Sequence, residues 1–316
     1  MTGETLSRGL AKSNATMHST SGQKEGKGNI NIFDEVNWDK TKLTLEAQNG
    51  INIFSNMNGS GTAKLELKYG QGSSDGGDAE LIFKRNAKVN LPAGENLSVQ
   101  KGSSGARQEF TVLYEMPLGN TLPSKNIAIG KDIDLRNKSD FVGVLFPDAN
   151  SSGNLWGLGH EIKGVTINGQ SNQTMGFVLV LGDGEIRDLK ITNFSLEAKG
   201  NDVIAGGAVV FIMGDAKISN VHTTGKIKNS YTSGGLVGTI KSNSKIYDSS
   251  AEVDIDTNAT GANIGGLVGS VENHNVGMTN IINSSASGRI YNDKNNNTPS
   301  NGSGRLVGAG NNLKIR

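Results

Sequence analysis

The pentapeptide GGLVG occupies residues 234–238, returns at residues 265–269, and has a near copy, GRLVG, at residues 304–308. The intervals between these copies are 31 and 39 residues. Recurrence at a period of about 20 to 50 residues indicates a repeat architecture, in which each copy is one structural unit that stacks on the next. The repeats therefore decide the fold before any other feature of the sequence.

The pentapeptide belongs to a longer unit, in which a short apolar run leads through a turn into a second run. The first runs start at Met175, Gly206, Gly234, Gly265 and Gly304. Within the second runs three columns align: Ile186, Ile218, Ile246 and Ile281; Asp188, Asn220, Asp248 and Asn283; and Ile227, Ile255 and Ile290. Short strands bounded by Gly, Asn and Asp, with equivalent residues in register, predict an all-β parallel β-helix, in which each coil buries apolar side chains on its neighbours.

The glycines of the pentapeptides have a structural interpretation. Glycine permits a positive φ and the close approach of neighbouring backbones at a corner, while Leu and Val supply the inward face. The residues to which we assign this role are Gly234, Gly235, Gly238, Gly265, Gly266 and Gly269.

The amino-terminal third repeats at a shorter period. INIF at residues 30–33 returns at residues 51–54, and LTL at residues 43–45 is echoed by LEL at residues 65–67. We expect three segments: residues 1–27, flexible or irregular; residues 28–125, one set of coils; and residues 126–316, a second set that ends in a cut coil. Polar interruptions predict loops at residues 68–78, 101–107 and 292–304.

Composition narrows the classes of function. The 31 basic and 30 acidic residues leave a net charge of +1, which gives no footprint for nucleic acid or an anionic membrane. No apolar run approaches the length of a membrane span, and the first residues lack the apolar core of a signal peptide. The chain has no cysteine, which rules out disulfides and thiolate metal sites and suits a polypeptide that crosses an oxidising periplasm unfolded. We expect no metal and no cofactor.

Two motif sets resemble known families. NIAIGKDIDL from residue 126, GLGHEIKGVTINGQ from residue 157 and the GGLVG units resemble the GLUG-motif proteins, which are bacterial surface or secreted chains. The repeats from residue 28 resemble filamentous-haemagglutinin-like exoproteins of two-partner secretion. The resemblance implies a right-handed parallel β-helix outside a Gram-negative cell, exported through an outer-membrane transporter. It also implies an adhesin for a host glycoprotein or glycan, with host haem or haemopexin capture as an alternative.

Parallel β-helices also include carbohydrate-active enzymes, which need clustered carboxylates. Asp132 with Asp134, and Asp254 with Asp256, could each share one face of a strand, although solvated strand residues explain both pairs more simply. The four histidines, His18, His160, His222 and His274, lack metal-ligand spacing, and His160 fits a structural role in its turn. We expect binding and no enzyme activity, so no catalytic residue is assigned.

Aromatic or basic side chains on loops are the expected source of binding affinity. The candidates are Lys68, Tyr69, Trp156, Asn292, Asn295 and Asn297. Eleven Asn-x-Ser/Thr sequons make glycosylation a second hypothesis, although Asn-rich turns and side-chain ladders also explain them. The sequons assigned to possible glycosylation are Asn58, Asn96, Asn137, Asn150, Asn172, Asn258, Asn283, Asn296 and Asn301.

Overall fold

The computed structural model describes residues 1–21, 26–84, 86–169, 173–200, 202–257, 262–272, 277–291 and 306–316. Its strands stack in parallel as about nine coils of a β-solenoid, which confirms the fold expected from the repeats. The chain divides into two compact units. Unit 1 comprises residues 1–115, 126–131 and 157–160, and unit 2 comprises residues 116–125, 132–156 and 161–316. The sequence placed one boundary at residue 126, whereas the chain passes between the units several times between residues 115 and 161.

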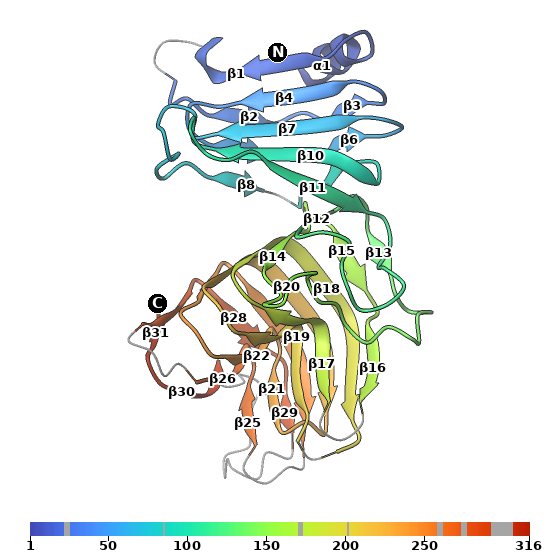
Figure 1. Ribbon diagram of the computed structural model, residues 1–316, viewed down its shortest axis with the longest axis vertical. Coiled ribbons are helices and arrows are strands. Elements are labelled where there is room, and N and C mark those ends of the chain that lie inside the picture. The colour runs from blue at the N-terminus through green and yellow to red at the C-terminus, as the bar shows by residue number, and fades with distance from the viewer. Residues whose placement is uncertain are drawn as a thin grey trace. The chain divides into compact units, whose positions relative to one another are not determined.

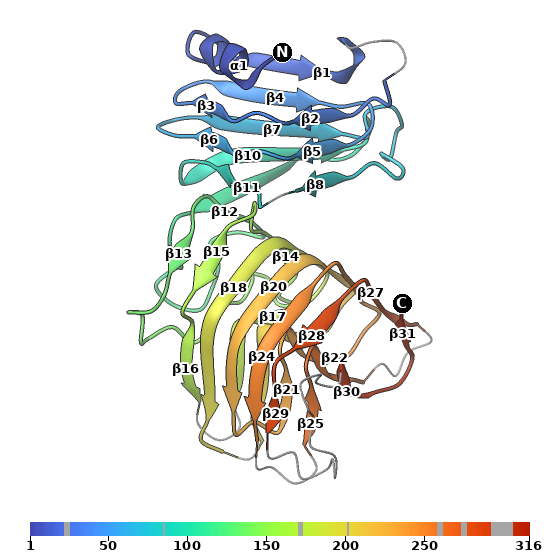
Figure 2. The same ribbon diagram turned by 180° about the vertical axis from the view of Figure 1, so that it is seen from behind.

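Unit 1 is built from three stacks of strands (Figures 1 and 2). The longest stack contains β1 (Ala15–His18), β4 (Lys42–Glu46), β7 (Lys64–Tyr69), β10 (Gly94–Lys101), β11 (Gln108–Leu113) and β12 (Asn126–Ile129). The two shorter stacks contain β2 (Ile30–Ile32), β5 (Ile51–Ile53) and β8 (Leu81–Phe83), and β3 (Val36–Trp38), β6 (Met57–Gly59) and β9 (Val89–Asn90). β10 and β11 pair antiparallel, which the repeats did not predict.

The short repeats of unit 1 lie in register as expected. Ile30 pairs with Ile51, which pairs with Leu81, and Leu43 pairs with Leu65 in the longest stack. These side chains are buried and form the core. Outward-facing asparagines are stacked by the same register: the Asn58 amide donates to Asn37 Oδ1 and accepts from Asn90, both at 2.8 Å.

The sequence predicted a flexible or irregular segment over residues 1–27. This prediction is wrong for residues 3–10, 15–18 and 19–21, which form regular structure. Helix α1 spans Gly3–Leu10, with Thr2 as its N-cap accepting from the Thr5 N–H, and β1 pairs with β4, before the short 3₁₀ turn η1 (Ser19–Ser21). Leu6 and Leu10 of α1 are buried, and each buried leucine contributes about 1.5–3 kcal/mol. The segment covers the first coil, because an uncovered coil end would expose apolar core to water. An eight-residue helix is too short for the periodicity test that predicts helices from sequence.

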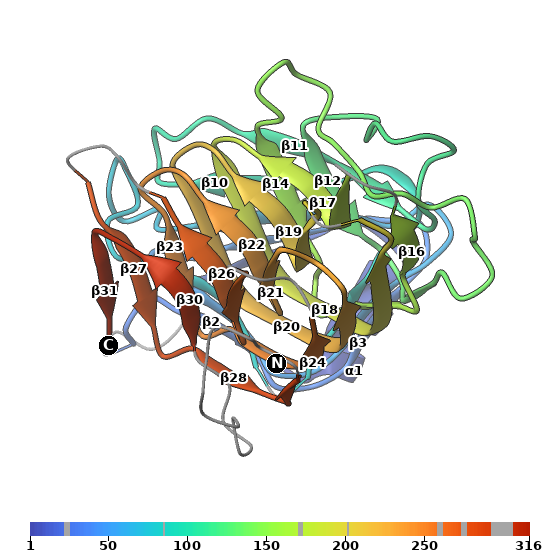
Figure 3. The same cartoon turned by 90° about the horizontal axis from the view of Figure 1, so that it is seen from below.

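Unit 2 has two facing stacks of strands (Figure 3). The first, here called the outer sheet, contains β13 (Ile133–Asp134), β14 (Gly153–Trp156), β15 (Glu161–Lys163), β16 (Thr166–Gly169), β18 (Gly184–Ala198), β20 (Ala216–Lys228), β23 (Lys245–Tyr247), β24 (Ser250–Asp256), β27 (Thr279–Ile282), β28 (Ser285–Ser287), β29 (Ile290–Tyr291) and β31 (Leu313–Ile315). The second, the GLUG sheet, contains β17 (Thr174–Leu181), β19 (Ile204–Ile212), β21 (Thr232–Gly234), β22 (Val237–Ile240), β25 (Asn263–Gly265), β26 (Val268–Val271) and β30 (Val307–Gly310).

The columns read from the sequence are neighbours in the outer sheet. Ile186 pairs with Ile218, Ile218 with Ile246, and Ile246 with Ile281, and all four are buried. The other isoleucine column is also in register, since Ile227 pairs with Ile255, which pairs with Ile290. The spacing of the repeats therefore gave the correct register of the stacked coils.

The pentapeptides form a stacked bulge in the GLUG sheet. The Leu236 carbonyl accepts from both Ala208 N–H and Val209 N–H, at 2.9 and 3.1 Å. The carbonyl of Leu267 accepts in the same way from the N–H groups of Leu236 and Val237 in the preceding coil. Two donors that share one acceptor mark a β-bulge, which bends each strand at the same point of every coil.

The glycines are needed at this bulge for space and not for a positive φ. A Cβ on Gly234 would lie 1.7 Å from the Val237 carbonyl oxygen, and one on Gly265 would lie 1.8 Å from that of Val268. One on Gly235 would lie 2.2 Å from the oxygen of Gly266, and one on Gly269 would lie 2.6 Å from that of Gly238. None of the six glycines assigned from the sequence is among the residues with positive φ, so that part of the sequence interpretation is wrong. The close-approach part is correct for Gly234, Gly235, Gly238, Gly265 and Gly269.

The residues of the Asp and Asn column, and not the glycines of the pentapeptides, have the left-handed backbone conformation. Asp188, Asn220, Asp248 and Asn283 have φ values of 52°, 51°, 49° and 48°. Asn and Asp adopt this region more readily than other side-chain-bearing residues. Asn220 donates to Asp188 at 2.8 Å and Asn283 donates to Asp248, so two acid–amide pairs link successive coils.

We expect Gly234→Ala to destabilise unit 2 by at least about 3 kcal/mol, because overpacking against backbone has no flexible neighbour that can yield. Gly169→Ala is the matched control in the same unit, since its added Cβ would meet only the Met175 side chain, at 2.8 Å from Sδ and 3.1 Å from Cγ. Urea unfolding followed by circular dichroism measures both. Equal stability of the two variants would contradict the close-approach explanation.

Candidate binding groove

A groove of about 910 Å³ lies at one corner of the solenoid in unit 2. It lies where strands of the GLUG sheet end and turn. Leu181, Ile212 and Ile240 are paired neighbours, so the turns that follow them are stacked in successive coils. These turns contribute Gly182 with Asp183, Met213 with Gly214, and Lys241 to the lining.

The opposite wall is the segment of residues 145–152, which does not belong to the repeats. Ser151, at φ 50°, fixes this segment to β17. Its buried hydroxyl accepts from Phe146 N–H at 2.9 Å and donates to the Val180 carbonyl at 2.8 Å. Asp148 accepts from Ser152 N–H at 2.7 Å, which closes the turn at the rim. The wall is therefore held by specific hydrogen bonds.

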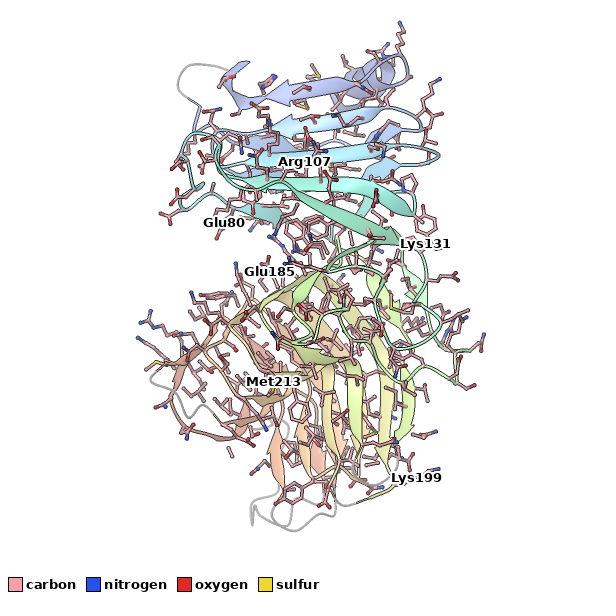
Figure 4. The ribbon with its side chains drawn as sticks, in the orientation of Figure 1. Glu80, Arg107, Lys131, Glu185, Lys199 and Met213 are labelled. Carbon is pink, nitrogen blue, oxygen red and sulfur yellow. The ribbon has the colours of Figure 1, made fainter. Side chains whose placement is uncertain are left out.

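The groove combines an apolar floor with charged edges. Val180 and Phe211 are paired neighbours on the floor, and Met213 is 50% exposed beside them. Met213 is labelled in Figure 4. Lys241 Nζ lies 5.4 Å from the centroid of the Phe211 ring, within the range of a cation–π contact.

Carboxylates stand at the rim of the same groove. Asp183 accepts from Asp215 N–H at 2.8 Å, and its own N–H donates to Ser152 Oγ at 3.0 Å. Asp148 and Asp183 are both exposed. An open groove of this volume, with an aromatic ring, a thioether and a few placed charges, matches the composition of ligand sites. It can bind a ligand, and its described lining contains no histidine or cysteine nucleophile or base.

The binding candidates named from the sequence lie elsewhere. Lys68 and Tyr69 belong to β7 and not to the loop expected there; Tyr69 is buried, and Lys68 Nζ pairs with Glu46 Oε2 at 3.0 Å. Trp156 is buried in β14, with the Arg187 guanidinium 5.0 Å from its ring centroid. These two aromatic rings are therefore not the exposed contacts that the sequence analysis expected. Asn292, Asn295 and Asn297 lie outside the described residues.

The loops expected at residues 68–78 and 101–107 are ordered against each other in unit 1. Ser103 N–H donates to the Ser73 carbonyl and Ser104 N–H to the Ser74 carbonyl, each at 2.9 Å. The excursions therefore stack as the coils do.

The carboxylate pairs considered for catalysis are engaged in structural contacts. Asp134 forms a fork with Arg136, and hydrogen bonds from the Arg136 side chain and backbone lower the pKa of Asp134 to about 2. Such a carboxyl stays ionised and is unsuited to act as a general acid. Asp132 accepts from Glu161 N–H and Asp254 accepts from Arg289 N–H, both at 3.0 Å. The position of His160 fits the structural role expected for it, since its buried Nε2 lies 2.8 Å from the Val89 carbonyl oxygen.

The sequons fall into three groups. Asn58 and Asn283 donate their side-chain amides within the ladders, and Asn96 donates to the carbonyls of Pro92 and Ala93. Asn137 and Asn150 are exposed, and Asn150 lines the groove. The remaining sequons assigned from the sequence lie outside the described residues: Asn172, Asn258, Asn296 and Asn301.

Comparison with protein families places one match inside unit 2. The family described as the GLUG motif matches residues 260–291, which include β25, β26, β27 and β28. Neither the curated proteins nor the solved structures give a match to this chain. Among the described residues, no helix has the length and apolarity required to cross a bilayer. A β-solenoid with a GLUG motif fits a surface exoprotein in general terms.

We expect an N-glycosyltransferase acting on the folded chain to modify Asn137 and Asn150 and to leave Asn58 and Asn283 unmodified. The amide nitrogens of Asn58 and Asn283 are already donors to Asn37 and Asp248. Peptide mapping by mass spectrometry reads out each site, and unfolded chain serves as the control in which all four become accessible. Equal modification of Asn58 in folded and unfolded chain would show that the ladder does not protect it.

Proposed function

We propose that this chain is part of an exported bacterial surface or secreted protein that binds a host macromolecule and acts as an adhesin. The observation that carries the proposal is the groove, in which the Phe211 ring and the exposed Met213 lie beside Lys241 and two rim carboxylates. The GLUG match and the solenoid support an exoprotein, and the resemblance to two-partner-secretion chains supports export through an outer-membrane transporter.

The proposed activity is binding without turnover. A solenoid presents its corners to solvent while the core holds the coils in register, so a ligand can contact the corner without rearranging the fold. Protein interfaces are enriched in aromatic residues and methionine, and the residues that dominate the binding energy lie near the centre, inside a polar rim. Phe211 and Met213, with charges around them, fit this description. Host haem or haemopexin capture is the alternative ligand class, and a carbohydrate-active enzyme is the alternative chemistry.

The test uses the immobilised chain, pooled human serum and a panel of immobilised host glycans, with mass spectrometry of whatever serum protein is retained. Met213→Asp should weaken retention at least about tenfold, since loss of a central contact costs more than about 1 kcal/mol and the new carboxylate adds charge beside Asp148 and Asp183. Met278→Asp is the matched control, because Met278 is 48% exposed in unit 2 and does not line the groove.

The outcomes separate the alternatives. A glycan or a serum protein lost only with Met213→Asp supports an adhesin that uses the groove, and recovery of haemopexin would assign nutrient capture. Retention that is equal in both variants, or no retention at all, would refute binding through the groove. Hydrolysis of any glycan in the panel would replace the binding proposal with the enzyme alternative.

A further inference from the structure

A line of hydrogen-bonded side chains crosses the outer sheet in unit 2, on β18 and β20 and the start of β24, and its members range from a buried carboxylate to a half-buried serine. It leads from an arginine through a carboxylate, an amide and an imidazole to a hydroxyl. Its members are Arg187, Asp188, Asn220, His222 and Ser250.

The first part of the line fixes the orientation of an amide. The Arg187 guanidinium is held over the Trp156 ring and its Nε donates to Asp188 Oδ2 at 2.6 Å. The other oxygen of this carboxylate lies 2.8 Å from the side-chain nitrogen of Asn220. An ionised carboxylate can only accept, so Asn220 must direct its NH₂ group to Asp188 and keep its oxygen for the next residue.

The second part fixes the tautomer of His222. Nε2 of this ring lies 2.9 Å from Asn220 Oδ1, and an amide oxygen only accepts, so Nε2 carries the hydrogen. In the neutral ring Nδ1 then has a free lone pair. Ser250 Oγ lies 2.7 Å from Nδ1, so its hydroxyl donates to the ring.

Burial favours the neutral form of the His222 ring. Burial, followed by the Lys190 ammonium, lowers the pKa of His222 below its ordinary value, while Asp188 and Asp248 oppose this shift. Lys190 is the direct neighbour of His222 on β18, and Ser250 is its neighbour on β24. A neutral imidazole that accepts from a hydroxyl is the arrangement by which a general base activates a nucleophile.

We propose that Ser250 is an activated nucleophile on this face and accepts an acyl group from an activated ester, with His222 as its general base. The Ser250 oxygen forms a bond to the carbonyl carbon, the ester C–O bond breaks, and the alkoxide or phenolate leaves with the bonding pair. The hydroxyl proton passes to His222 Nδ1 and from there to the leaving alkoxide oxygen, or to water when a phenolate leaves. Asn220 and Asp188 are positioning residues, because they act only through the ring.

The proposed reaction is one acylation per chain and does not depend on the binding proposed for the groove. Ser250 is half-buried at the surface of the sheet, and therefore has some access to a small ester in solution. Ser285 is the internal comparison, since it is the next residue of the same outward column and pairs with Ser250 in the ladder. Its hydroxyl has no hydrogen bond to a histidine among the described residues.

The experiment incubates the full chain with p-nitrophenyl acetate and locates acetyl groups by peptide mapping, with p-nitrophenolate release as the rate. We expect acetylation of Ser250 and a loss of about 100-fold in its rate in His222→Gln, which matches the contribution of a general base. In Ser285→Ala, Ser250 should be acetylated at the unchanged rate. Ser250→Ala should lack the adduct at residue 250, while surface lysines still react slowly.

The dependence of the rate on pH gives a second readout that a purely structural ladder would not produce. The Ser250 rate should rise with pH as His222 loses its proton, with a midpoint below the ordinary histidine pKa of about 6.5, because the neutral ring is the base. Asn220→Ala should shift or flatten this profile, and unchanged circular dichroism would show that the variants are folded. An absent Ser250 adduct, or one whose rate is the same in His222→Gln, would overturn the proposal.

Discussion

The structure depends on the stacking of equivalent residues across neighbouring parallel strands. Each coil repeats the preceding one at the separation of hydrogen-bonded strands, so a residue is in contact with its own counterpart above and below. At the GLUG bulge this constraint is severe. A Cβ on Gly235 or Gly269 would overlap a carbonyl oxygen of a neighbouring coil, and a Cβ on Gly234 or Gly265 would overlap the carbonyl oxygen three residues further along its own coil. The glycines of the pentapeptide therefore stand where the backbone leaves no space for a Cβ, and Leu and Val stand where a side chain fits.

The same register that stacks isoleucines in the core stacks polar residues on the outside. A column of one charge would be costly, since like charges directly opposite on neighbouring strands repel. In the left-handed column Asp and Asn alternate instead, and each of the two acid–amide pairs gives an amide donor to a carboxylate acceptor. In unit 1 the ladder of Asn37, Asn58 and Asn90 avoids like charges with amides alone, because an amide can both donate and accept, as Asn58 does.

The hydrogen-bonded line that ends at Ser250 arises from this alternation. Asn220 lies in the left-handed column, and its partner Asp188 leaves only the amide oxygen to face His222. The tautomer of a histidine is thus set by the identity of a residue in the preceding coil. Trp156 and Arg187 belong to the same arrangement, since the stacked guanidinium holds the carboxylate at the start of the line.

The sequence predicted the parts of the fold that are formed by repeated residues. Ile186, Ile218, Ile246 and Ile281 occupy the same place in successive repeats, so their register could be predicted from the sequence alone. Residues 145–152, which form one wall of the groove, have no counterpart in other coils, and their position depends on the Ser151 bonds to residues distant in sequence. Tyr69 and Trp156 were wrongly predicted to be exposed for a related reason. The burial of an aromatic residue next to a predicted loop or glycine depends on where the strand ends, and the sequence does not give this boundary. In both cases the strand includes the aromatic residue. The groove wall is therefore built from residues outside the repeat, whereas the hydrogen-bonded line that ends at Ser250 is built on the left-handed column, which repeats.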